Sequence, residues 1–167
     1  MIIVFSIIGA VIVALSAVLT AAAIMGRPLK VNPSRKLDGV SDDIQNALWY
    51  SSIAANSHNT QMWSVKLYPN ENRLQISIDE SRVLGVVDSE KREAYISLGC
   101  YVETMSVAFS AYGYDTQINC NDLSVQVAYQ KRENATVDTV KLSLIDKRHT
   151  DKSAYSNGKI KQETATA

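Results

Sequence analysis

Six polar side chains follow one another in the middle of the sequence, between two stretches with regular apolar patterns. They are Asn56, Ser57, His58, Asn59, Thr60 and Gln61. Their hydroxyl, amide and imidazole groups both donate and accept hydrogen bonds, which suits an uncharged ligand rich in heteroatoms. A polar loop is more often a solvated connector, although loops carry a large share of binding residues. Residues 56–61 are therefore the first candidate for a binding site.

Other kinds of chemistry find little support in the sequence. His58 and His149 lie far apart, and no CxxC or HExxH motif predicts a metal site. There is no glycine-rich loop of the GxGxxG or Walker type and no serine in a nucleophile elbow. Cys100 and Cys120 are too few for a disulfide framework, although a single bridge between them stays open. We therefore expect no metal site and no side chain that acts as a catalytic acid or base.

The charge balance of the chain bears on its partners. Its 167 residues include 17 basic and 17 acidic side chains, so the net charge is zero. A nucleic-acid-binding domain would show clustered lysines and arginines, and we expect no nucleic acid as a partner. The hydrophobic residues, 46% of the chain, are concentrated at the start, where Ile2–Met25 contains no charged residue.

That apolar stretch is long enough to cross a membrane. At ~1.5 Å per residue a helix over it would span about 36 Å, more than the ~30 Å hydrocarbon core. We expect residues 1–25 to form a single-pass anchor in the cell membrane. A cleavable signal is the alternative, with small residues at 21–23, although no basic residue precedes the run. The basic residues that follow it favour a cytoplasmic globular part: Arg27, Lys30, Arg35 and Lys36.

The rest of the chain predicts one small α+β domain over residues 41–155, after a linker at 26–40 and before a polar tail at 156–167. Ser41-Asp42-Asp43 is a typical helix start, and this helix should end near residue 54 or 55. Alternating residues predict a β-hairpin over 63–78. The longest helix should run from about Ser89 to Tyr112, with Gly113 as a left-handed cap. The remaining strands are predicted at 115–119, 125–130 and 137–144.

Four stretches together resemble a known family. Residues 55–63, Ala-Asn-Ser-His-Asn-Thr-Gln-Met-Trp, resemble the P-S-S-H-N-T-Q-P-W signature of the nitroreductase superfamily, in the form found in its Acg-like FMN-binding branch. Residues 88–99 are similar to the D-P-x-x-R-E-x-x-I-S-x-G stretch that opens a long helix there, and residues 111–114 match the A-x-G-Y that closes it. Residues 146–152 resemble the R-R-x-T-x-R phosphate motif.

The resemblance implies a nitroreductase-like half-domain, a small antiparallel sheet packed on helices, that binds FMN. Loop residues would hydrogen-bond the flavin ring or its ribityl chain, and three residues near the C-terminus would hold the phosphate. The alternative for the last three is a solvated basic turn, and an exposed loop histidine is more often a spectator than a ligand group. The full cofactor-binding set is Asn56, Ser57, His58, Asn59, Gln61, Arg148, Thr150 and Lys152.

The implied activity is electron transfer from NAD(P)H through FMN to a nitro or quinone-like small molecule. A non-catalytic, membrane-anchored flavin-binding or interaction module is the alternative. The chain departs from the pattern at Ala55 and Met62, where the family has proline, at Asn56, where it has serine, and at Lys152, where it has arginine. Proteins of this branch contain two nitroreductase-like halves with the flavin pocket between them. We therefore expect a missing second half, or a homodimer that completes the site.

Overall fold

The computed structural model of the chain describes residues 13–20, 36–121, 124–150 and 153–154. The chain divides after Ser34 into two units. In the first unit, residues 13–20 are helical and exposed. Most of the predicted membrane segment, much of the linker and almost all of the polar tail lie outside the described residues. Within the described ranges, no helix combines the length and apolar character that crossing a membrane requires.

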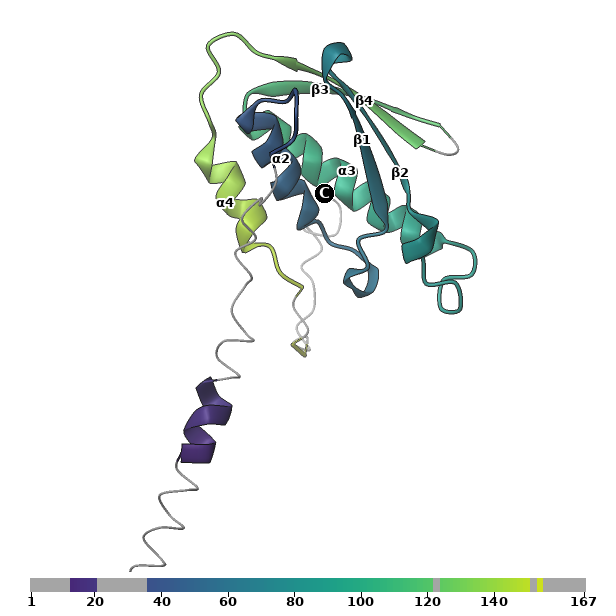
Figure 1. The fold of residues 1–167 in the computed structure, drawn as a ribbon, viewed down its shortest axis with the longest axis vertical. Helices are drawn as coiled ribbons and strands as arrows, with labels where there is room; N and C mark the ends of the chain where they lie inside the picture. The colour runs from purple at the N-terminus through teal and green to yellow at the C-terminus, as the bar shows by residue number, and fades with distance from the viewer. Residues whose placement is uncertain (1–12, 21–35, 122–123, 151–152, 155–167) are drawn as a thin grey trace, which may run out of the picture. The chain divides into compact units, whose positions relative to one another are not determined.

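The second unit contains an antiparallel sheet with the strand order β1-β2-β4-β3 (Figure 1). Its strands are β1 (Trp63–Tyr68), β2 (Arg73–Ile78), β3 (Tyr114–Cys120) and β4 (Ser124–Lys131). The predicted hairpin is confirmed, because Trp63 pairs with Ile78 and Tyr68 with Arg73 across β1 and β2. The predicted strands at 115–119 and 125–130 are confirmed as the second hairpin, β3 and β4.

Helix α2 (Asp42–Ser52) begins where the sequence predicts. The Ser41 hydroxyl oxygen accepts a hydrogen bond from the Ile44 amide at 3.3 Å, and two acidic residues lie at the positive end of the helix dipole. The helix ends at Ser52, slightly earlier than expected, and Ile53 follows as its cap. Short 3₁₀ turns occur at η1 (Ser57–Asn59), η2 (Pro69–Glu71) and η3 (Glu80–Arg82).

The long helix α3 (Arg92–Ala111) packs against the sheet. Helices α2 and α4 (Thr139–Lys147) both contact α3. The apolar residues of α3 at spacings of three and four form a stripe in which every member is at least nine-tenths buried: Ala94, Leu98, Val102, Met105, Phe109 and Tyr112. Leu74, Ile76 and Val127 face it from the sheet and are fully buried. The α+β class is therefore confirmed.

The predicted start of α3 at Ser89 is wrong by three residues. The helix begins at Arg92, after Lys91 adopts a left-handed backbone with φ 57°. Asp88 still caps it, because its two carboxylate oxygens accept from the amides of Glu93 at 3.0 Å and Ala94 at 2.8 Å. At the other end Gly113 has the predicted left-handed conformation, with φ 79°.

The strand predicted at 137–144 is wrong, because this segment forms α4. The Asp138 carboxylate accepts from the amides of Val140 and Lys141, both at 3.1 Å, and so begins a helix. Leu142 and Ile145 lie three positions apart and are buried, whereas Leu144 is exposed. The apolar residues of this segment alternate as in a strand, but the buried ones have the spacing of a helix.

Candidate functional site

The loop after α2 folds back on itself through its own polar groups. The Asn56 side chain accepts from the Gln61 amide at 2.9 Å and donates to the Ala54 carbonyl at 3.0 Å. His58, Asn59 and Gln61 all have left-handed backbones, with φ between 49° and 55°. Such conformations are costly for residues with a Cβ, and they concentrate at functional sites, where surrounding contacts hold them.

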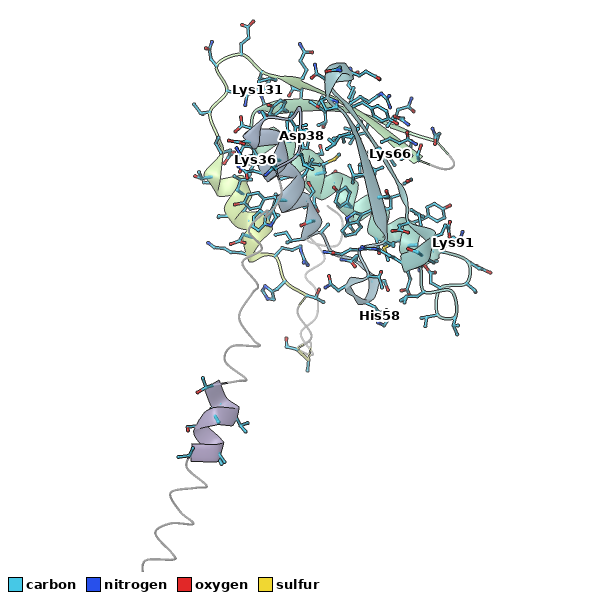
Figure 2. The ribbon with its side chains drawn as sticks, viewed as in Figure 1. Lys36, Asp38, His58, Lys66, Lys91 and Lys131 are labelled. Atoms are coloured by element: carbon cyan, nitrogen blue, oxygen red, sulfur yellow. The ribbon has the colours of Figure 1, made fainter. Side chains whose placement is uncertain are left out.

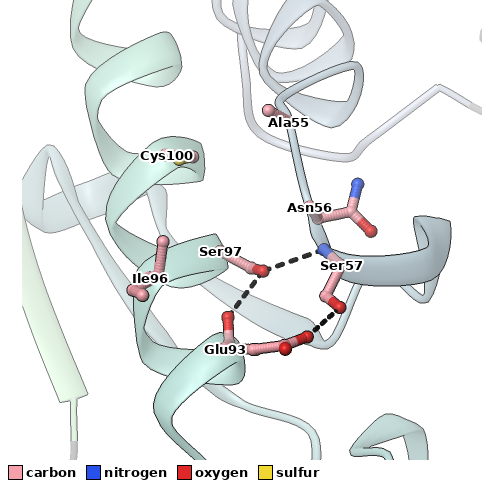
Figure 3. A pocket seen from close by; sticks show the side chains of 7 residues that line it. All are labelled: Ala55, Asn56, Ser57, Glu93, Ile96, Ser97 and Cys100. Atoms are coloured by element: carbon pink, nitrogen blue, oxygen red, sulfur yellow. Dashed lines mark hydrogen bonds between the residues drawn. The ribbon is translucent and has the colours of Figure 1, made fainter. Parts of the chain in front are cut away.

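The loop is fastened to the first turns of α3 by two hydrogen bonds from Ser57, and a third hydrogen bond lies within the helix (Figure 3). The Ser57 amide donates to the Ser97 hydroxyl oxygen at 3.1 Å, and the Ser97 hydroxyl donates to the Glu93 carbonyl at 2.7 Å. The Ser57 hydroxyl donates to the Glu93 carboxylate. A hydrogen bond to an ionised acceptor is stronger than one between neutral groups, so Glu93 is the main anchor of this loop.

A cavity of about 230 Å³ lies between the loop and α3. Its lining combines polar and apolar groups from both elements: Ala55, Asn56, Ser57, Glu93, Ile96, Ser97 and Cys100. Small-molecule sites range over about 300–1,000 Å³. The cavity therefore has the mixed character of a ligand site but only part of the usual volume.

The predicted loop residues fall into two groups. Asn56 and Ser57 line the cavity. His58 lies exposed at the outer tip of the loop (Figure 2), and Asn59 is exposed beside it. The Gln61 side chain turns the other way and donates to the Ser52 carbonyl at 3.0 Å, which satisfies the end of α2. Gln61 thus supports the loop from behind.

Of the predicted phosphate-binding residues Arg148, Thr150 and Lys152, Arg148 contacts the segment that leads into the loop. The Arg148 guanidinium donates to the Ile53 carbonyl at 3.1 Å, which brings the end of α4 to the end of α2. Arg148 is otherwise exposed, and Thr150 is exposed as well. Lys152 lies outside the described residues. The structure therefore brings Arg148 next to the start of the loop.

Glu93 and Ser97 are the site residues that sequence reasoning did not select. They line the cavity and bind Ser57, although they lie 36 and 40 positions away from it. Glu93 lies in the stretch that resembles a family motif, but the cofactor-binding set that the resemblance implies does not include it. The available signal was its position in the first turn of the helix, on the same side as the small residue Ser97.

Two aromatic residues support the strand that follows the loop. The Trp63 ring stacks on Tyr101, with centroids 4.6 Å apart and planes 30° apart, so it serves in packing. Tyr101 is buried, and this burial raises the pKa of its hydroxyl. Cys100 and Cys120 are both free, so no bridge joins them. Among the described residues no group of three or more His, Cys, Asp or Glu could hold a metal ion.

The described residues thus form a small α+β domain with a partly polar cavity beside its longest helix. No family model matches the chain. Over 77 residues it is 34% identical to the probable NAD(P)H nitroreductase PigM of a Serratia species. That match covers 46% of this chain and 21% of the relative, so it spans about a fifth of the relative's length. A nitroreductase family protein from Streptococcus pneumoniae TIGR4 overlaps 83% of this chain and 93% of its own, with a TM-score of 0.44 and 10% identity.

Proposed function

We propose that this chain is an FMN-dependent oxidoreductase of the nitroreductase type. Two sequence likenesses support the proposal: that of residues 55–63 to the family signature, and that of 77 residues to PigM, which is named a probable NAD(P)H nitroreductase. One structural observation carries it, namely that Asn56 and Ser57 of that signature line a cavity against α3. By the same likeness, the electron donor is NAD(P)H and the acceptor is a nitro or quinone-like small molecule.

The residues of the cavity fit the uncharged part of FMN better than its phosphate. Asn56 and Ser57 offer amide and hydroxyl groups, whereas the Glu93 carboxylate would repel an anion. The phosphate would be held by Arg148, Thr150 and Lys152. Arg148 has five N–H donors, of which one goes to Ile53. The positive charge that attracts the phosphate must come from the Arg148 guanidinium, because the nearby end of α2 is the negative end of its helix dipole.

The modest volume of the cavity supports a site that a second surface completes. A space of about 230 Å³ is below the usual range for small-molecule sites. We propose that another copy of the chain, or a second half like that of the two-half proteins, covers the rest of the flavin. When bound, FMN supplies hydride-transfer chemistry, and the protein contributes position and hydrogen bonds.

The proposal is tested by titrating the full-length chain with FMN and following the quenching of flavin fluorescence. A chain with Asn59→Ala and Gln61→Ala should bind FMN roughly 5-fold to 100-fold more weakly, since each neutral hydrogen bond is worth ~0.5–1.5 kcal/mol. The control carries Asn119→Ala and Gln130→Ala, which remove the same groups from exposed strand positions. Equal affinity in both double variants would remove Asn59 and Gln61 from the site.

A non-catalytic flavin-binding module is the second candidate. The internal hydrogen bonds of Gln61 and Arg148 leave these side chains supporting the protein itself, which weighs against tight flavin binding and does not separate a binding module from an enzyme. Oxidation of NADH or NADPH in the presence of a nitroaromatic acceptor decides between the two. A yellow protein that oxidises neither would be a binding module, and a protein that ignores added FMN would be neither.

We further propose that Ile2–Met25 anchors the chain in the cell membrane with the domain on the cytoplasmic side. The uncharged stretch is long enough, and the nearest basic residues, beginning with Arg27 and Lys30, follow it. Protease added to intact cells should leave the domain whole. Digestion of the domain under those conditions would reverse the assigned orientation.

A further inference from the structure

The polar side chains that line the cavity already donate their hydrogen atoms to other groups of the protein. Ser57 has two donors, and both point to α3: its amide to the Ser97 oxygen at 3.1 Å and its hydroxyl to the Glu93 carboxylate. The Ser97 hydroxyl donates to the Glu93 carbonyl at 2.7 Å. Because a serine hydroxyl has only one hydrogen, both hydroxyl oxygens can only accept further hydrogen bonds.

The side-chain amide of Asn56 is likewise hydrogen-bonded within the protein. Its nitrogen donates to the Ala54 carbonyl at 3.0 Å and, more weakly at 3.5 Å, to the Asn59 side-chain oxygen. Its oxygen accepts from the Gln61 amide at 2.9 Å, which fixes the orientation of the group. Asn56 therefore adds no free side-chain donor to the cavity.

Glu93 gives the cavity a negative charge. One of its carboxylate oxygens binds Ser57, and the other has no protein partner in the described ranges. No lysine, arginine or histidine of the described chain forms an ion pair with it. The nearest basic neighbours do not neutralise it either, since the Lys91 ammonium binds Glu80 at 2.7 Å and the exposed Arg92 does not line the cavity.

The start of α3 does not offset this charge with free amide groups. The amides of Glu93 and Ala94 donate to Asp88, a second carboxylate that is itself buried. The amide of Tyr95 donates to the Lys91 carbonyl at 3.0 Å. Three of the amides that usually make a helix N-terminus attractive to anions are therefore occupied.

We propose that this cavity selects a ligand group that donates hydrogen bonds and carries no negative charge: an imide or amide N–H, a hydroxyl, or a protonated amidine or amine. Ser57 and Glu93 accept from that group, and Glu93 is its specificity-determining residue. A carboxylate or phosphate is rejected there, because it would face acceptors and a like charge. This rests on the proposed function only for the view that the cavity takes a ligand.

The test uses two small probes of the same shape and opposite character, benzamidine and benzoate. The full-length chain is labelled at isoleucine methyl groups and titrated with each probe in the absence of flavin, and the Ile96 methyl signal is followed. Benzamidine should shift this signal in a saturable way, at an affinity at least about tenfold higher than that of benzoate. Equal or tighter binding of benzoate would overturn the proposal.

A pair of variants assigns the selectivity to one residue. Glu93→Gln keeps the shape of the side chain but adds donors and removes the charge, so benzamidine affinity should fall at least about tenfold. Glu103→Gln is the control, since Glu103 is on the same helix and lines a different cavity. A loss caused by the Glu103 change and not by the Glu93 change would place the probe elsewhere and overturn the assignment.

The two proposals fail independently in this design. If the chain ignores FMN but prefers benzamidine over benzoate, the oxidoreductase proposal fails and the selectivity stands. If it binds FMN but prefers benzoate, the selectivity fails alone. Should the Glu93 variant not fold, the comparison of the two probes on the unmodified chain still decides.

Discussion

The two halves of helix α3 have different surroundings. In the C-terminal half, Met105 and Phe109 are fully buried, and the Phe109 ring meets Tyr114 and Tyr129 with centroids 5.8 and 5.5 Å away. In the N-terminal half, Ile96 is 51% exposed, and a Cβ added to Gly99 would meet no other atom within 4 Å. Ala94, Leu98 and Tyr101 still keep one face of the N-terminal half in the core. The helix therefore contributes to the core along its whole length and, at its N-terminal end, also forms a wall of the cavity.

This difference assigns the larger contribution to stability to one half of α3 and ligand binding to the other half. Side chains in close-packed surroundings contribute most to the free energy of unfolding, whereas binding regions belong to less densely packed parts of a fold. The C-terminal half fixes α3 against the sheet. The N-terminal half can then expose a charged and partly apolar surface without loss of the fold.

The strongest test of this contrast is truncation of the buried ring. Phe109→Ala should lower the free energy of unfolding by about 3–5 kcal/mol, because it removes a buried aromatic ring and leaves a cavity. Ile96→Ala, on the same helix but half exposed, should cost less than about 1.5 kcal/mol. Urea unfolding followed by circular dichroism measures both. Similar losses would mean that the two halves are equally packed.

Two glycines extend the comparison: Gly99 in the N-terminal half of the helix and Gly113, two positions beyond its last residue. Gly113→Ala should be strongly destabilising, by about 1–2 kcal/mol for its left-handed backbone and about 1–3 kcal/mol for overpacking, since an added Cβ would lie 2.3 Å from the Ala135 Cβ. Gly99→Ala should stabilise the helix by about 0.5–1 kcal/mol. Thermal unfolding of the two variants should therefore shift in opposite directions, and a shared direction would contradict the contrast.

The start of the exposed half depends on one carboxylate. Asp88→Ala should lower the unfolding free energy by roughly 1 kcal/mol, the usual worth of a helix cap, because two amides lose their acceptor. Ser89→Ala, at the residue from which the sequence predicted the helix to start, should change it by less than about 0.5 kcal/mol. A larger effect at Ser89, measured by chemical denaturation, would restore the predicted start.

The smallest expected effect is a gain. His58→Gly should stabilise the chain by up to about 1 kcal/mol, because glycine relieves a left-handed backbone worth ~1–2 kcal/mol and loses ~0.5–1 kcal/mol through added unfolded-state freedom. His149→Gly is the control, since His149 has no positive φ. If His58→Gly lowered the melting temperature as the control does, contacts of the imidazole would outweigh the strain of the left-handed backbone at the loop tip.

Much of the fold could be predicted from local patterns. Alternation from Trp63 onward and the apolar stripe of α3 each repeat often enough to identify an element, and Gly113 marks where α3 stops. The segment at 137–144 could not be identified this way. Its apolar residues fit both periods, and only the Asp138 cap distinguishes the helix.

The site could be predicted only in part, for a related reason. Asn56 and Ser57 are adjacent in sequence and were identified as a cluster of donors and acceptors. Glu93 and Ser97 reach the same cavity through tertiary structure, and no local pattern joins them to the loop. The roles of Gln61 and Arg148 were equally hidden, because their partners are backbone carbonyls at the end of α2.

The strand order has a consequence for how the chain folds. The two hairpins close between neighbours in sequence, but the central ladder joins Leu74 to Val127 across the whole of α3. Hairpins form in about 1–10 μs, whereas closing so long a loop delays the central pairing. Refolding followed by tryptophan fluorescence should therefore be much slower than hairpin formation. A microsecond refolding phase that recovers the whole signal would show that the central ladder is not the slow step.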